Sequence, residues 1–175
     1  MSVENKFLKA RAKLLMEQPF FGTLALRLKV VETDKIDTAA TDGRQLMYNA
    51  KFIDKLTSHQ LVGLIAHEVM HCVYNHMTRR QERDPKVWNV ACDYAINDHL
   101  LACNFILPEG GIVDTKGEFT NMTAEAIYNK LYEDGRVIEM PAWGLVQDSG
   151  QQSTNGSSNA AVESDWQVAV NQAAE

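Results

Sequence analysis

The sequence lacks the features that mark several common classes of protein. Its 175 residues carry a formal net charge of −6, whereas a protein that binds the phosphate backbone normally shows a clustered excess of Lys and Arg. No apolar run approaches the ~20 residues that cross a bilayer. The N-terminus opens on a charged stretch and not on the apolar core of a signal peptide. We therefore expect no nucleic-acid partner, no membrane partner and a cytoplasmic location.

Cysteine is also scarce. Cys72, Cys92 and Cys103 are odd in number, and none belongs to a C-x-x-C pair, the spacing typical of thiolate zinc sites and redox centres. Cys72 and Cys92 are each next in sequence to a candidate metal ligand, but adjacent residues of a helix point about 100° apart. We interpret the cysteines as reduced, buried thiols and not as metal ligands.

The composition predicts one globular domain, because 45% of the residues are hydrophobic and 23% are charged. The last part of the chain differs from the rest. A stretch from Gln147 to Ser164 is rich in Gln, Ser, Asn and Gly, which is typical of a flexible linker. We expect a folded domain over residues 1–140, a linker over 141–164, and the start of a truncated helix over 165–175.

The most informative motif is His67-Glu68-Val69-Met70-His71, which reads H-E-x-x-H. Two histidines four residues apart lie on one side of a helix, so both imidazoles can reach one metal ion. Glu68 directly follows the first histidine, where zinc metalloproteases place the carboxylate that takes a proton from the metal-bound water. The motif predicts metal-dependent hydrolysis; the alternative is that both histidines are hydrogen-bonded core residues.

The flanks of the motif predict a buried helix. They contain no proline, and Leu61, Leu64, Ile65, Val69 and Val73 recur at helical spacing. Thr57 or Ser58 is a suitable N-cap.

Catalytic zinc commonly has three protein ligands, so the two histidines need a companion. A second helix is predicted from about Val87 to Leu101, and Asn89, Asp93 and Asn97 form a polar stripe along it at intervals of four residues. Asp93 is the only carboxylate in this stripe, and a carboxylate oxygen is a normal zinc ligand. We predict Asp93 as the third ligand; the alternative is a carboxylate that hydrogen-bonds a ligand histidine.

Other side chains compete for this position. His76 lies about 140° from His71 on a continuous helix, so only a break in the helix would bring it to the site. His99 and Asp98 lie off the polar stripe, Asn97 lies on it, and His59 precedes the motif helix and is expected to be exposed.

The remaining patterns predict an α+β fold, with a small, mainly antiparallel sheet packed on the metal-site helix and further helices. Residues 4–17 have helical periodicity, and residues 24–31 alternate like a strand with one buried face. An Asp-Gly turn signal at Asp42-Gly43 separates two short strands within residues 39–48. Residues 52–56 suit a short helical turn.

Two helical blocks carry a resemblance to a known family. The residues concerned are Ala66 to His71, Asn75, His76, Arg79, Trp88 to Asn97 and the turn Leu107-Pro108-Glu109-Gly110. With the later helix Thr123 to Leu131, the likeness spans most of residues 1–140. The chain resembles the "putative metallopeptidase domain" family of bacteria and phages, whose members often carry a following von Willebrand factor A-like domain.

The resemblance implies a minimal zincin-like fold, with His67, His71 and Asp93 around Zn²⁺ and Glu68 as general base. It also implies an AAA+ ATPase as a candidate partner, although the second domain of longer relatives is not seen in this sequence. We expect a zinc metallopeptidase that acts on a peptide or protein substrate, bound as a strand along the sheet edge near Gln45 to Asn49. Two alternatives are a metal-stapled interaction module and a regulatory adaptor, and Mn²⁺, Fe²⁺ and Co²⁺ also accept such ligands.

Overall fold

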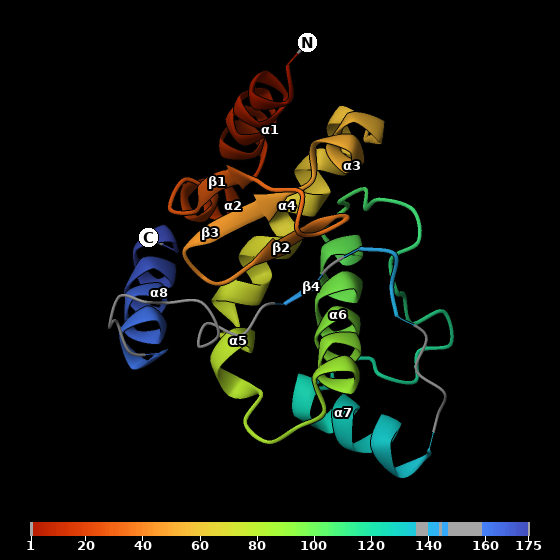
Figure 1. The fold of residues 1–175 in the computed structure, drawn as a ribbon. Coiled ribbons are helices and arrows are strands. Elements are labelled where there is room, and N and C mark those ends of the chain that lie inside the picture. The colour runs from red at the N-terminus through yellow and green to blue at the C-terminus, as the bar shows by residue number, and fades with distance from the viewer. Residues whose placement is uncertain (1, 136–139, 144, 147–158, 175) are drawn as a thin grey trace.

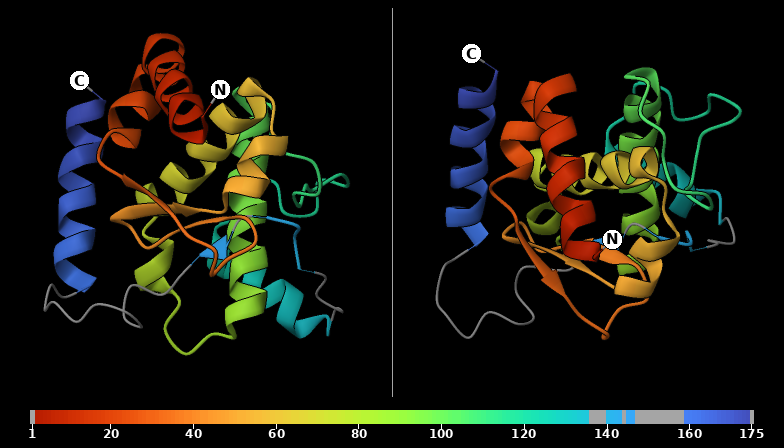
Figure 2. Two further views of the ribbon diagram at one scale, coloured as in Figure 1. Left: turned by 45° about the horizontal axis from the view of Figure 1, so that its top comes forward. Right: turned by 90° about the horizontal axis from the view of Figure 1, so that it is seen from above.

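A computed structural model describes residues 2–135, 140–143, 145–146 and 159–174 of the chain. Its elements follow in this order: α1 (Val3–Glu17), α2 (Pro19–Ala25), β1 (Lys29–Glu32), β2 (Ala39–Thr41), β3 (Gln45–Tyr48), α3 (Ala50–Lys55), α4 (Ser58–Val73), α5 (His76–Arg79), α6 (Pro85–Ala102), α7 (Ala124–Glu133), β4 (Leu145–Val146) and α8 (Asn159–Ala173). Helix α4 runs through the middle, with α6 and α8 on opposite sides of it (Figures 1 and 2). The α+β prediction is confirmed.

Helix α4 begins as the sequence predicts. The Thr57 hydroxyl accepts a hydrogen bond from the Gln60 backbone N–H, while the Gln60 side chain accepts one from the Thr57 N–H, so the two residues form a capping box. Every residue from Leu61 to Cys72 is buried. A helix that is buried all round belongs to a protein core, and this burial encloses the motif.

The strand predicted over residues 24–31 is wrong in its first part. Pro19 starts a second helix, α2, which extends to Ala25, and only Lys29–Glu32 form a strand. Leu24 and Leu28 are buried as the alternation suggests, but Leu26 is 56% exposed. The cause is tertiary: a Cβ at Gly22 would lie 2.3 Å from the Cα of Leu15, so the glycine lets α2 pack directly on α1.

The sheet has the order β1-β3-β2-β4, and the prediction that it is mainly antiparallel is wrong. The turn at Asp42 and Gly43 makes β2 and β3 antiparallel, but β1 pairs with β3 in parallel and β4 pairs with β2 in parallel. The turn fixes only the β2–β3 pairing, whereas β1 joins from the segment just before β2 and β4 comes from a distant part of the chain. Because β3 is an inner strand, Gln45 to Asn49 do not form the free edge that we expected for a substrate.

Helices α6 and α7 confirm the two later predicted helices and pack on each other around a second apolar cluster. That cluster contains Trp88, Val90, Ala91, Cys92, Phe119, Ala124, Ile127, Tyr128 and Leu131. In the described residues, no helix combines the length and the apolar character needed to cross a membrane.

Helix α8 begins at Asn159, within the segment expected to be a linker, and packs against α2, α4 and α5. Val162, Trp166 and Ala169 join the main core at the helical spacing of one apolar face. Residues 144 and 147–158 of the expected linker lie outside the described residues. The division at residues 140 and 164 stays a prediction.

Candidate metal centre

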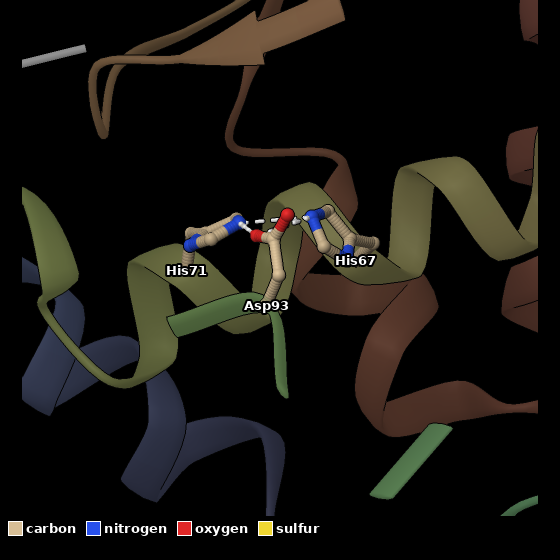
Figure 3. A group of neighbouring side chains, drawn as sticks. All are labelled: His67, His71 and Asp93. Carbon is tan, nitrogen blue, oxygen red and sulfur yellow. Dashed lines mark hydrogen bonds and ion pairs between the residues drawn. The ribbon is translucent and has the colours of Figure 1, made fainter. Parts of the chain in front are cut away.

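Three side chains from two helices converge at one buried point (Figure 3). The Nε2 atoms of His67 and His71 on α4 lie 2.9 Å apart. The Oδ1 atom of Asp93 on α6 lies 3.6 Å from His67 Nε2 and 3.4 Å from His71 Nε2. One ligand atom from each residue fits within 4.8 Å of the others. The structure thus brings together the three residues that the sequence singled out as ligands.

Asn97 fixes the orientation of the first imidazole. Its Nδ2 donates to the backbone oxygen of Ile112 over 2.8 Å, so its Oδ1 faces His67 Nδ1, also at 2.8 Å. His67 Nδ1 must therefore carry the proton and donate it, which leaves a lone pair on Nε2 directed at the other two donors. The polar stripe of α6 contributes this orienting amide as well as the carboxylate.

His76 contacts the imidazole of His71 in a similar way. Its Nδ1 lies 3.1 Å from His71 Nδ1, and its backbone oxygen accepts the indole N–H of Trp88 over 3.0 Å. A break in the helix is needed to bring His76 to this position, and the structure has one. Helix α4 ends at Val73, and Asn75 adopts a left-handed conformation with φ of 53°. The sequence held a signal for it, since Asn tolerates that conformation better than most residues.

The carboxyl groups of the site are buried without compensation. Both oxygens of Glu68 and the Oδ1 of Asp93 have no hydrogen-bond partner. Burial raises the pKa of Glu68 to about 8. It also raises the pKa of Asp93 well above its usual value, and the nearby charge of Glu68 adds to this rise. Buried polar groups in proteins are normally paired, so these atoms mark a place where a positive charge would be stabilised.

Burial acts on the histidines in the opposite direction. It lowers the pKa of His67 to about 4, although the hydrogen bond to Asn97 works to raise it. Burial also lowers the pKa of His71 well below its usual value, with a contribution from the charges of His67 and His76. Imidazoles that are neutral at physiological pH are ready to ligate a metal. Two neutral imidazoles and one carboxylate suit Zn²⁺ and similar transition-metal ions, so the residues present fit such an ion.

Within the part of the chain that the structure describes, the other competing side chains, His59, His99 and Asp98, form no hydrogen bond or ion pair with the three donor residues. His59 and His99 are exposed, and Asp98 accepts a hydrogen bond from the backbone N–H of Asp114. Cys72 and Cys92 are free, buried thiols as expected, whereas Cys103 is free but only partly buried. A cavity of about 450 Å³ lies beside His76, but its lining includes none of the three donor residues.

Trp143 is a residue of the site that the sequence gave no reason to select. Its ring centroid lies 4.8 Å from that of His67, with an edge-to-face angle of 69°. No motif or periodicity connects a tryptophan at position 143 with the helix that carries His67.

Comparison with known proteins agrees with this geometry. The family described as "Putative metallopeptidase domain" matches residues 2–174. The chain belongs to this family. A protein of Thermotoga maritima named only "Uncharacterized protein" is 33% identical over 107 residues, which are 57% of this chain and 27% of the relative. The match thus spans about a quarter of that relative's length. No solved structure matches the chain.

Proposed function

We propose that this family member is a zinc-dependent peptidase in which His67, His71 and Asp93 hold Zn²⁺ and Glu68 is the general base. The convergence of three donor atoms within 4.8 Å, wholly inside the protein, carries the proposal. Bound Zn²⁺ would act as a Lewis acid and supply a water molecule of lowered pKa as the nucleophile. Membership of the family supports a metallopeptidase, while zinc and catalysis are parts of our proposal.

The protein's own residues would then handle the protons. Glu68 would accept a proton from the attacking water on a carboxyl oxygen and deliver it to the leaving amine. Its carboxyl is free for this role because neither oxygen is used in a hydrogen bond. Burial alone raises the pKa of Glu68 to about 8, but a nearby divalent cation acts against this and favours the ionised, basic form.

Asn97 and His76 would act as positioning residues. Each engages the Nδ1 atom of a ligand imidazole, at 2.8 Å for His67 and 3.1 Å for His71. Such contacts hold the rings in the tautomer that presents Nε2 to a metal and raise the basicity of the ligand.

Burial of the site favours a second candidate function, that of a metal-stapled interaction module or adaptor. His67, Glu68 and His71 are 0% exposed and Asp93 is 1% exposed. Structural zinc sites are closed, whereas catalytic sites keep a position open to water and substrate. Work with an AAA+ ATPase, which the sequence resemblance implies, stays a prediction under either function.

Elemental analysis and peptide hydrolysis by the purified full chain test the two functions together. We expect about one zinc per chain and turnover of a fluorogenic peptide library. Glu68→Gln should keep the zinc and lose turnover by ~10²–10⁴-fold, the usual contribution of a general base. Glu82→Gln is the matched control, because it makes the same chemical change at an exposed position.

The outcomes separate the two candidates. Turnover that is unchanged in Glu68→Gln would overturn the catalytic role of this carboxylate. Zinc in the wild-type protein without any turnover would favour the interaction module, and wild-type protein that takes up no transition metal would refute both.

A further inference from the structure

The candidate site is closed by a segment that is remote from it in sequence. Trp143 is 1% exposed and packs edge-to-face on His67, with ring centroids 4.8 Å apart. His67 itself has no exposed surface. Trp143 lies outside α4 and α6, the two helices that carry the donor residues. A separate segment of the chain therefore covers His67.

The indole lies in a slot formed by the turn after α6. Its Nε1 donates to the backbone oxygen of Pro108 over 3.1 Å. A Cβ on Gly111 would lie 2.6 Å from the ring, so glycine allows the indole to approach the backbone this closely. The preceding Ala142 donates its backbone N–H to Gly110 over 3.1 Å. These contacts hold Trp143 through backbone groups and close packing.

The same segment continues into β4, which takes the outer edge of β2. Ala40 pairs with Leu145 and Thr41 with Val146, in parallel. Strand β2 lies directly on the turn of α4 that carries Glu68, since the Thr41 hydroxyl is 3.6 Å from the Cys72 thiol and this thiol donates to the Glu68 backbone oxygen. Strand β2 thus lies beside the helix that carries His67, Glu68 and His71, and β4 runs along the outer edge of β2 (Figure 1).

We propose that Ala142, Trp143 and β4 form an internal strap, which closes the metal site and occupies the edge of β2 where an extended peptide would otherwise bind. A sheet edge offers main-chain N–H and C=O groups to any extended peptide, as β-augmentation requires. A strand of only two residues makes few ladder hydrogen bonds, so its release costs little compared with global unfolding. The peptide class rests on the proposed function, whereas closure by the strap does not.

Reactivity of individual histidines tests closure without any need for catalysis. The probe is diethyl pyrocarbonate, which modifies neutral imidazoles, and mass spectrometry locates the product on the full chain after a chelator has removed metal. The exposed His59 and His99 serve as internal references. In the wild type we expect His67 to react at least ~100-fold more slowly than His59, because modification requires local opening.

The test variant is Trp143→Ala, and the matched control is Trp166→Ala. Trp166 is also a buried indole that donates to a backbone oxygen, that of Gly43 at 2.7 Å, but it lies on α8. Trp143→Ala should speed the modification of His67 by ~10-fold or more and leave His59 unchanged, as expected for loss of a local closed state. Trp166→Ala should leave both rates unchanged.

Two results would overturn the strap. One is an unchanged His67 rate in Trp143→Ala; the other is an equal acceleration in Trp166→Ala, which would indicate general loosening. If circular dichroism shows Trp143→Ala to be unfolded, Trp143→Phe replaces it. That variant keeps an aromatic ring but loses the bond to Pro108, and an unchanged His67 rate there contradicts the strap in the same way.

Peptide hydrolysis by the same variants separates the strap from the proposed function. Faster turnover in Trp143→Ala supports both. Faster modification of His67 with no turnover in any variant supports closure but refutes the peptidase function and the peptide class with it.

Discussion

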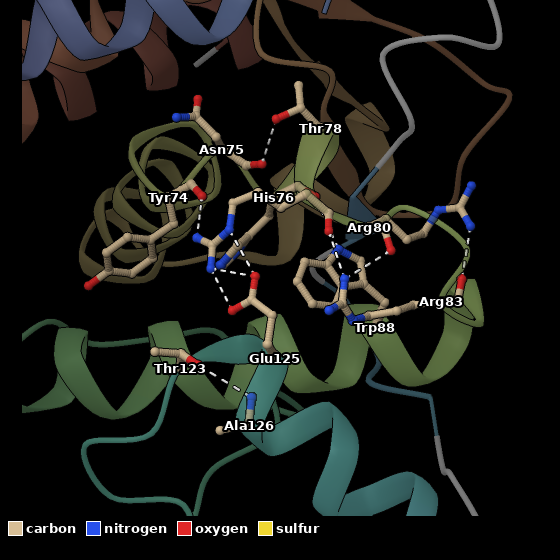
Figure 4. Close-up of polar contacts among 11 residues, drawn as sticks. Tyr74, Asn75, His76, Thr78, Arg80, Arg83, Trp88, Thr123, Glu125 and Ala126 are labelled. Atoms are coloured by element: carbon tan, nitrogen blue, oxygen red, sulfur yellow. Dashed lines mark hydrogen bonds and ion pairs between the residues drawn. The ribbon is translucent and has the colours of Figure 1, made fainter. Parts of the chain in front are cut away.

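Two groups of charged residues lie at α6, and they differ in whether their charges are paired within the protein. In the first group the Arg79 guanidinium is paired: its Nη2 lies 2.6 Å from both carboxyl oxygens of Glu125, and its Nη1 donates to the Tyr74 backbone oxygen over 2.7 Å (Figure 4 labels these two partners). In the second group Glu68 and Asp93 are buried with carboxyl oxygens that have no hydrogen-bond partner. One group is complete within the protein, and the other lacks a positive charge.

The pKa values of the two glutamates express this difference. Partial burial works to raise the pKa of Glu125, but the hydrogen bonds and charge of Arg79 outweigh it and the pKa is lowered. The pKa of Glu68 rises to about 8, because burial acts without a compensating cation. A structural carboxylate finds its partner in the fold, whereas a carboxylate kept for a ligand does not.

The largest effect on zinc affinity is expected when the charge of Asp93 is removed. Asp93→Asn takes away the only anionic donor among the three candidate ligands, so we expect zinc affinity to fall by more than ~100-fold. This loss exceeds the one expected when a residue that only hydrogen-bonds a ligand is changed. Competition with a chromogenic chelator measures it. Asp98→Asn, on the neighbouring face of α6, is the control and should bind zinc like the wild type. Equal affinities in all three proteins would move the third ligand elsewhere.

Loss of the orienting amide should have a smaller effect on the same quantity. Asn97→Ala removes the acceptor for His67 Nδ1, and zinc affinity should fall by ~10–100-fold. Asn97→Asp keeps an acceptor at that position and should restore most of the affinity. If Asp rescues nothing, the amide acts through its bond to Ile112 and not through the imidazole.

The pH dependence of stability distinguishes the two glutamates in the metal-free protein. Because the pKa of Glu68 rises from 4.5 to about 8 on folding, its contribution is fully present below pH 4.5 and is lost as the pH rises through 8. The lowered pKa of Glu125 acts in reverse, and its contribution is lost as the pH falls through its folded pKa.

Urea unfolding between pH 4 and 9 should therefore show the free energy of unfolding falling, by at least ~1 kcal/mol, as the pH rises towards 8, and levelling off above it. Glu68→Gln should reduce this fall and Glu125→Gln should not, while Asp93, whose pKa is also raised, accounts for the fall that remains. His67, with a pKa lowered to about 4, adds an acid fall, because below pH 6.5 the unfolded chain takes up a proton that the folded one does not.

The smallest effect is expected at the paired group. Glu125→Ala breaks a half-exposed ion pair, so the free energy of unfolding should fall by about 1 kcal/mol or less, with zinc affinity unchanged. Thermal unfolding together with the chelator assay measures both. A loss of zinc binding here would show that the two polar groups are coupled through α6, and the contrast between them would disappear.

Local sequence signals predicted much of the fold. The N-cap signal at Thr57 or Ser58, the helical spacing of the two metal-site helices and the Asp-Gly turn each act within a few residues, and α4, α6 and the β2–β3 pair follow from them. Where neighbours from elsewhere in the chain decide the structure, the local signal failed. Residues 19–25 are helical because α2 packs on α1, and β3 has no free edge because β1, which lies outside the β2–β3 hairpin, pairs with it.

The sequence by itself determined which residues can share the candidate site. His67, Glu68 and His71 share a helix, and Asp93 and Asn97 share the next long one, because helical periodicity sets which residues share a face. Only the tertiary structure decided what surrounds them: the turn at Asn75 that brings His76 to His71, and the arrival of Trp143 over His67. Those contacts join segments whose approach depends on packing of the whole chain, and no local pattern encodes them.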